Sequence, residues 1–111
     1  MEIIDRYKEI IISELTYRSS IPILNAPDLE RQLVVSKSET EFLLLSYGWH
    51  KKRYRHNIVF HLEIKHSKVW IHQDNTDVGI ATKLVERGIP AKDIVLGFLP
   101  AYAREMSGFA A

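Results

Sequence analysis

The N-terminal part of the chain carries apolar residues at intervals of three and four positions. These residues are Ile3, Ile4, Tyr7, Ile10, Ile11 and Leu15. Because residues at this spacing share one side of an α-helix, the pattern predicts a helix over residues 2–19. Pro22 and Pro27 follow, and proline lacks the backbone N–H that a helix interior requires. We therefore expect a loop over residues 20–28.

The middle of the chain has the short apolar runs that are typical of strands. Residues 29–36 and 41–50 are rich in leucine, valine and aromatic residues between polar breaks, which predicts two strands. Residues 54–65 predict a third strand, because two sets of side chains alternate along them with the period of two that is typical of a half-buried strand. The sets are Ile58, Phe60, Leu62 and Ile64 against Val59, His61, Glu63 and Lys65. We expect a turn at His66-Ser67 and a fourth strand over residues 68–73.

A second helix is predicted after the fourth strand. Thr76 is the candidate N-cap, and Asp77 in the first turn favours the helix dipole. The apolar stripe ends at Gly88 and consists of Ile80, Ala81, Leu84 and Val85. Residues 90–93 then predict a short helical turn, residues 94–98 an extended segment, and the chain from Pro100 a short helix or ordered tail.

This order of elements predicts an α+β fold. Strands joined by short connections pair antiparallel, and two helices can cover one face of the sheet. We expect a two-layer domain with a mainly antiparallel sheet of four to five strands, an N-terminal helix and a second helix after strand four. Its predicted core includes Ile10, Ile11, Leu62, Ile64, Ile71, Leu84 and Val85.

Length and composition narrow the class of protein. The 111 residues predict a single domain over residues 1–111, with 46% hydrophobic and 26% charged residues. There is no cysteine, no apolar run of membrane-spanning length, and an N-terminus made acidic by Glu2 and Asp5. We therefore expect a cytoplasmic protein without a membrane partner. The net charge is only +1, so any contact with DNA must be local.

Histidines in the predicted hairpin are the first candidates for chemistry. A turn at His66-Ser67 pairs His61 with His72 and brings Glu63 to the same face, a set that can hold zinc. The turn is imperfect, however, and no nucleophile, second carboxylate or phosphate-binding loop accompanies these residues. Polar residues on an open sheet face are the simpler interpretation. We predict no catalytic residue, no metal site and no cofactor.

Trp70 shares that predicted face and is the one large aromatic residue on it. Tryptophan is enriched among residues that dominate binding energy, so we predict a partner-binding surface. Its candidate residues are His61, Glu63, Trp70 and His72. In the alternative, Trp70 is covered within the monomer by a C-terminal segment that carries Phe98, Tyr102 and Phe109.

A basic run lies at the predicted turn between strands two and three. Lysine and arginine beside Tyr54 can contact phosphates and stack on a base. The candidate DNA-binding residues are Lys51, Lys52, Arg53 and Arg55. The alternative is a solvated hairpin tip whose charge maintains solubility, which is the commoner use of such a run.

Several motifs together resemble one family. They are Gly48-Trp49, His61-Leu62-Glu63-Ile64-Lys65, Lys68-Val69-Trp70-Ile71, the run from Gly88 to Phe98, and Pro100, Arg104, Phe109 and Ala110. In this order they resemble the XisI proteins, the fdxN element excision controlling factors, which are best known from filamentous cyanobacteria. The family usually has Asp-Gly where this chain has His66-Ser67, so we expect a longer or differently shaped loop there. His50 and His72 also depart from the family pattern, so their chemistry is not carried over.

The resemblance implies participation in programmed excision of a DNA element, beside a recombinase and an XisH-type companion that looks like a restriction nuclease. We therefore expect a non-enzymatic controlling factor that binds an XisH-like partner. Two alternatives remain open, a direct DNA-binding accessory factor and an antitoxin-like inhibitor of the companion. Contact with DNA through the recombinase and self-association into a homo-oligomer are further expectations.

Overall fold

The first helix forms where the apolar periodicity predicts it. The computed structural model describes residues 2–22, 25–76 and 79–110. Helix α1 (Ile3–Ser19) matches the helix predicted over residues 2–19. Tyr7, Ile11 and Leu15 recur every four positions along α1, and all three side chains are buried. The helix therefore presents one continuous apolar stripe to the rest of the chain.

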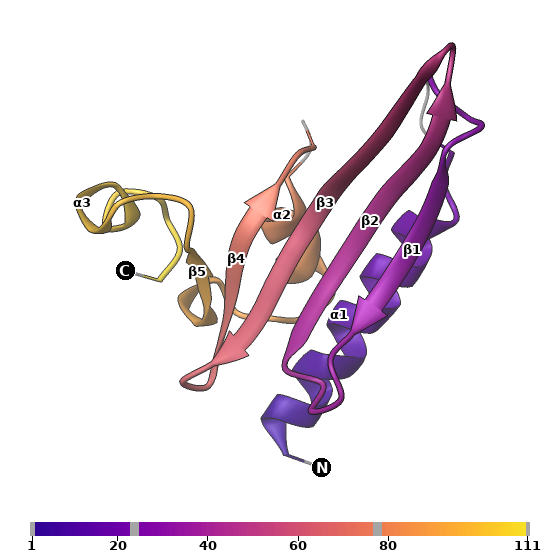
Figure 1. The fold of residues 1–111 in the computed structure, drawn as a ribbon. Coiled ribbons are helices and arrows are strands. Elements are labelled where there is room, and N and C mark those ends of the chain that lie inside the picture. The colour runs from indigo at the N-terminus through magenta and orange to yellow at the C-terminus, as the bar shows by residue number, and fades with distance from the viewer. Residues whose placement is uncertain (1, 23–24, 77–78, 111) are drawn as a thin grey trace.

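Within the described residues, five strands form one sheet in the order β1-β2-β3-β4-β5 (Figure 1). Their bounds are β1 (Glu30–Val35), β2 (Glu41–His50), β3 (Arg53–Lys65), β4 (Lys68–Asp74) and β5 (Ile94–Leu96). Strands β1 to β4 pair antiparallel because short turns join them, whereas β5 is parallel to β4. The predicted α+β class with a mainly antiparallel sheet is confirmed.

The β3–β4 hairpin closes through a two-residue turn at His66 and Ser67. Lys65 pairs with Lys68, so no further loop residue separates the strands. His66 has φ 55° and Ser67 has φ 62°, the left-handed values that a type I′ turn needs at both central positions. The longer or differently shaped loop that we expected is wrong. The short connection holds two non-glycine residues in a conformation that costs them free energy.

The second helix, α2 (Ile80–Glu86), begins later than predicted. Its N-cap is Gly79, whose φ of 82° lies outside the helical region. Thr76 is not the N-cap, because it lies three residues before Gly79; its hydroxyl donates to Asp74 Oδ1 at 2.6 Å and accepts the Gly79 N–H at 3.4 Å. Asp74 Oδ2 instead accepts the Ile80 N–H at 2.6 Å and satisfies one donor of the first turn. Asp77 lies outside the described residues.

The C-terminal elements follow the predicted order. A 3₁₀-helix, η1 (Ala91–Asp93), precedes β5, and α3 (Ala101–Arg104) follows Pro100. The end of the chain returns to the sheet, since Val95 forms a parallel bridge with Ala110. None of the helices in the described ranges is both long and apolar enough to cross a membrane.

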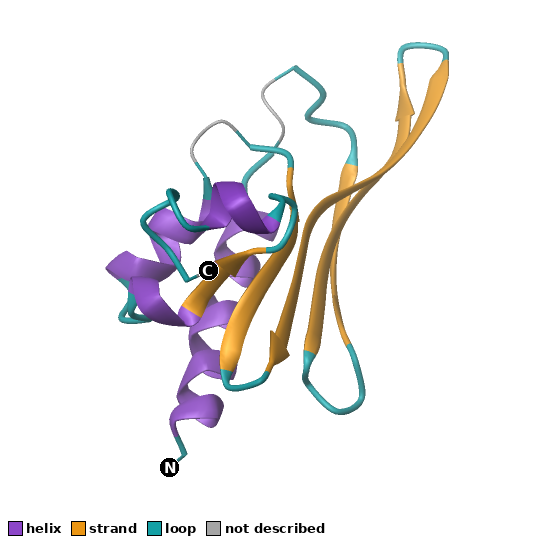
Figure 2. Ribbon diagram, turned by 90° about the vertical axis from the view of Figure 1, so that its left-hand side faces the viewer, coloured by secondary structure: helices purple, strands orange, loops and turns teal. Residues whose placement is uncertain are grey.

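Helices α1 and α2 cover one face of the sheet, and Figure 2 shows the opposite face of β1, β2 and β3 without a helix over it. The core lies between the two layers. Of the predicted core, Ile11, Leu62, Ile64, Ile71 and Leu84 are buried and Ile10 packs against them. Val85 is 39% exposed, so its assignment to the core was wrong. The inward stripe of the short α2 consists of Ile80, Ala81 and Leu84, and Val85 lies beside it.

Candidate functional site

Two β-bulges determine which side chains reach the uncovered face. The β2–β3 register shifts between Leu44 and Leu45, which leaves Val59 as an extra residue in β3. Val59 is buried, and Ile58 instead lines a hollow on the uncovered side with Leu43. The predicted alternation, with Ile58 inward and Val59 outward, is therefore wrong. An inserted residue reverses the side on which every earlier residue of the strand lies.

The uncovered side, which we call the open face, carries an apolar band. Its apolar and aromatic members are Val34, Leu43, Leu45, Tyr47, Trp49, Tyr54 and Ile58. A hollow of about 300 Å³ lies among Val34, Leu43 and Ile58, with His61 and Glu41 at its border. Apolar side chains in such a hollow gain free energy when a partner covers them. The open face is therefore the main candidate interaction surface.

Two histidine–glutamate pairs lie along the open face. His61 Nε2 is 3.3 Å from Glu41 Oε1, and His72 Nε2 is 2.9 Å from Glu63 Oε1. The second bulge makes His72 an extra residue, so His61 pairs with Gln73 and the predicted pairing of His61 with His72 is wrong. The two imidazole rings are nevertheless adjacent, with centroids 4.8 Å apart. Among residues 2–22, 25–76 and 79–110, no group of three His, Cys, Asp or Glu side chains is placed to hold a metal ion.

Trp70 projects onto the open face at its β4 edge, opposite Glu63 as predicted. Part of its ring is covered. Lys65 Nζ lies 4.5 Å from the ring centroid and the Arg104 guanidinium carbon lies 5.6 Å from it. A Cβ on Gly97 would come within 3.3 Å of Trp70 Cε3.

The C-terminal cover over Trp70 differs from the one expected. It consists of Gly97 and Arg104, whereas Phe98 and Tyr102 are exposed. Phe109 packs against the core instead. The part of the open face that remains uncovered is centred on β1 to β3, and the partner-binding role of His61, Glu63, Trp70 and His72 stays a prediction.

The β2–β3 hairpin extends well beyond the helices and carries the basic run at its tip (Figures 1 and 2). Lys51, Lys52, Arg53 and Arg55 are all exposed. Tyr54 pairs across the hairpin with Trp49 on the open face, with ring centroids 5.4 Å apart. Because side chains alternate along a strand, Arg53 and Arg55 lie on the opposite face. The predicted combination of arginines with a stacking tyrosine is therefore divided between two faces.

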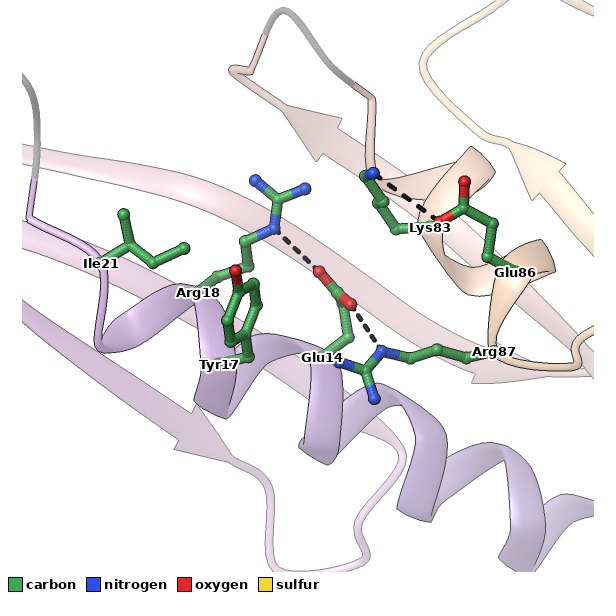
Figure 3. Close-up of a pocket in the computed structure, with 7 residues that line it drawn as sticks. All are labelled: Glu14, Tyr17, Arg18, Ile21, Lys83, Glu86 and Arg87. Atoms are coloured by element: carbon green, nitrogen blue, oxygen red, sulfur yellow. Dashed lines mark hydrogen bonds and ion pairs between the residues drawn. The ribbon is translucent and has the colours of Figure 1, made fainter.

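A buried carboxylate that sequence reasoning missed joins the two main helices (Figure 3). Glu14 is 4% exposed and accepts hydrogen bonds from Arg18 Nε at 2.8 Å and Arg87 Nε at 2.6 Å. It lines a groove of about 500 Å³ between α1 and α2. Burial raises the pKa of Glu14, but hydrogen bonds and charges of both arginines outweigh it and hold the pKa below 4.5. Glu14 therefore links α1 to the C-terminal end of α2 through its ion pair with Arg87.

The sequence contained a signal for this contact. Glu14 lies between Ile11 and Leu15 on the apolar stripe of α1, where a charged residue needs a partner. A second link between α1 and the C-terminal half is the hydrogen bond from the Tyr7 hydroxyl to Asp93. Burial and this acceptor raise the pKa of Tyr7 to about 12.

In the part of the chain that the structure describes, fold and site together define a two-layer α+β protein with no helix over the open face of β1 to β3. The model of the XisI protein family matches residues 1–111. The chain therefore belongs to the XisI family, as the motif resemblance predicted.

Solved structures agree with this assignment. A XisI-like protein from Anabaena variabilis ATCC 29413 is 29% identical, with a TM-score of 0.83 and an alignment that covers 96% of each chain. The fdxN element excision controlling factor XisI from the same strain is 27% identical, with a TM-score of 0.78 and 98% of each chain covered. A comparison with curated proteins gave no match. The family name supports a role in the control of excision.

Proposed function

We propose that this chain is a non-enzymatic controlling factor for excision of a DNA element, and that it acts by binding an XisH-like partner. The observation that carries the proposal is the apolar band on the open face, which the chain's own helices leave uncovered. Exposed apolar patches of this kind mark interaction sites on soluble proteins. A partner that buries Val34, Leu43 and Ile58 removes apolar surface from water.

Polar groups around the hollow give such a contact its orientation. The His61–Glu41 pair lies at its border, and the Glu63–His72 pair continues toward Trp70. An apolar centre with a polar rim is the usual anatomy of a protein interface. In this proposal the predicted partner-binding residues His61, Glu63, Trp70 and His72 form the rim, and Val34, Leu43 and Ile58 form the apolar centre.

In this proposal the partner, and not this chain, carries the nuclease activity. His61 and His72 are each hydrogen-bonded to a glutamate, and no hydrogen bond among the described residues continues from either imidazole to a serine or threonine nucleophile. We expect the purified chain alone neither to cleave nor to join DNA. Mg²⁺-dependent cleavage by a clean preparation, abolished by a point mutation in this chain, would contradict that part.

The direct test is co-expression with the product of any XisH-like gene adjacent to the gene for this chain, followed by size-exclusion chromatography. We expect a single complex that contains both proteins. A nuclease assay of the companion with and without this chain then separates two modes of control, since cleavage rises under licensing and falls under restraint. Independent elution of two folded proteins would contradict the proposal, and elution of this chain as a homo-oligomer without the companion would favour self-association over partner binding.

A further inference from the structure

A row of polar side chains crosses three strands on the helix side of the sheet, at the root of the β2–β3 hairpin. Arg31 of β1 pairs with Ser46 of β2, and Ser46 pairs with Asn57 of β3. The row borders a pocket of about 270 Å³. Arg55, Asn75 and Thr76 line the same pocket. None of its described lining residues belongs to α1 or α2, so the pocket lies outside the helix-covered core.

Two buried polar atoms of this pocket find no hydrogen-bond partner among the described residues. Ser46 is 3% exposed, and its Oγ is unpartnered. The Nε of Arg31 is also buried and unpartnered, although its Nη1 donates to the Arg18 carbonyl at 2.8 Å. Leaving a buried donor unsatisfied costs about 1–3 kcal/mol, so such groups are rare unless something binds them. Two of them in one pocket indicate a ligand.

The charge of the pocket indicates what kind of ligand fits. Arg31 and Arg55 supply two guanidinium groups, and none of the described lining residues is acidic. Burial lowers the pKa of the Arg31 guanidinium, and the nearby charge of Arg18 lowers it further. Both effects destabilise a cation that lacks a counter-charge, and a bound anion would reverse them. Guanidinium, hydroxyl and amide donors together are the set that binds phosphate oxygens.

We propose that this pocket binds a phosphate group, and that the phosphate belongs to a DNA backbone. The hairpin supplies the reason for choosing DNA. Arg53 precedes Arg55 by two residues and lies on the same side of β3, nearer the hairpin tip. Lys51 and Lys52 complete the exposed tip. A strand of duplex DNA repeats its phosphates along its length, so one backbone meets the pocket and then the tip. This site is on the side of the sheet opposite the proposed partner surface and does not depend on it.

The first test is calorimetric titration of the full chain with inorganic phosphate, which we expect to show saturable binding. Ser46→Ala removes a hydroxyl without a partner, so its urea unfolding midpoint stays the same or rises while phosphate affinity falls about tenfold. Arg31→Gln should abolish the binding. Phosphate affinity that is unchanged in a folded Ser46→Ala protein, or no saturable binding to the wild type, would overturn the site.

The second test identifies DNA as the source of the phosphate. Anisotropy of a short fluorescein-labelled duplex is measured over a series of salt concentrations. Arg55→Gln should lower the slope of log affinity against log salt by about 1, because one phosphate contact is lost. The control is Lys37→Gln, which removes an equal charge from the β1–β2 turn at the other end of the sheet. A slope that Arg55→Gln leaves unchanged, with inorganic phosphate still bound through Ser46, would contradict the assignment to DNA.

Discussion

The two faces of the sheet use the same residue type for different purposes, and three consecutive leucines in β2 show the contrast. Leu44 points toward α1 and is fully buried, whereas Leu43 and Leu45 lie half-buried on the open face. Packing in the core explains why residue 44 is apolar, because burial of Leu44 stabilises the fold. Core packing does not explain why Leu43 and Leu45 are also apolar. The helix side therefore contributes stability and the open face is free for binding.

The largest expected effect is the loss of stability on truncating a core leucine. Leu44→Ala should lower the free energy of unfolding by about 2–5 kcal/mol, because it leaves a cavity in the core. Leu62→Ala, also fully buried, should cost a similar amount. The matched control, Leu43→Ala, should cost less than about 1.5 kcal/mol because part of its side chain is already in water. Urea denaturation measures the free energy of unfolding of all three variants. Equal losses for Leu43→Ala and Leu44→Ala would show that the two faces do not differ in their contribution to stability.

The next effect concerns the carboxylate that joins the helices. Glu14→Gln should cost about 1–3 kcal/mol, because charge-assisted bonds to Arg18 and Arg87 are weakened in a buried site. The control is Glu86→Gln, which removes an exposed pair with Lys83 at 3.7 Å and should cost less than about 0.5 kcal/mol. A Glu14→Gln protein as stable as Glu86→Gln would show that the buried bridge contributes nothing.

The same carboxylate predicts a pH dependence. The folded pKa of Glu14 lies below its ordinary value of 4.5, because hydrogen bonds from both arginines outweigh the effect of burial. Its stabilising contribution is therefore complete above pH 4.5 and is lost as the pH falls through the folded pKa. Unfolding of wild type and Glu14→Gln measured at a series of acidic pH values should converge. A difference that stays constant down to the lowest pH would contradict this linkage.

A smaller effect is expected at the other contact of α1. Tyr7→Phe should cost about 1 kcal/mol, because the hydrogen bond to Asp93 is lost while the ring remains packed. The pKa of Tyr7 is raised from 10.0 to about 12, so its contribution is complete below pH 10 and is lost as the pH rises through about 12. Ultraviolet titration of the phenols should show one tyrosine that ionises late in the wild type and none in Tyr7→Phe.

The smallest effect is a gain. Ser67→Gly should stabilise the protein by about 0.5–1 kcal/mol, because glycine adopts a φ of 62° without the clash that serine suffers. The control is Ser38→Gly in the β1–β2 turn, where the positive φ belongs to Glu39 and the serine hydroxyl lies 2.8 Å from Thr40 Oγ1, so this change should destabilise the protein. A thermal denaturation midpoint lowered by Ser67→Gly would mean that the turn depends on the serine side chain.

Periodicity and composition together were enough to predict the order of the helices and strands, although α2 begins later than predicted. The stripe of Tyr7, Ile11 and Leu15 located α1, and the polar breaks around residues 41–50 located β2 at its observed bounds. The bulges at Val59 and His72 left no comparable signal, because one inserted residue changes the register without changing composition. For that reason the apolar centre of the open face, which depends on Ile58, was not predicted.

Neighbours in sequence were also poor guides to neighbours in space. Lys52, Arg53, Tyr54 and Arg55 form one basic run, yet alternation places Tyr54 on the open face and the two arginines on the other. Arg31 joins Arg55 only because β1 and β3 flank β2 in the register set by Ser46. Such sites depend on strand pairing, which a single sequence specifies through its hydrophobic pattern and the geometry of its turns.

One pair of variants tests the proposed binding of the XisH-like partner to the open face. Val34 on the open face and Val85 on the helix side are each 39% exposed, so a glutamate at either position is equally accessible to water. Calorimetry of each folded variant with the purified partner should show Val34→Glu binding at least about tenfold more weakly, or about 1.4 kcal/mol, while Val85→Glu binds like the wild type. Equal affinities for the two variants, or a loss confined to Val85→Glu, would show that the partner does not bind the open face.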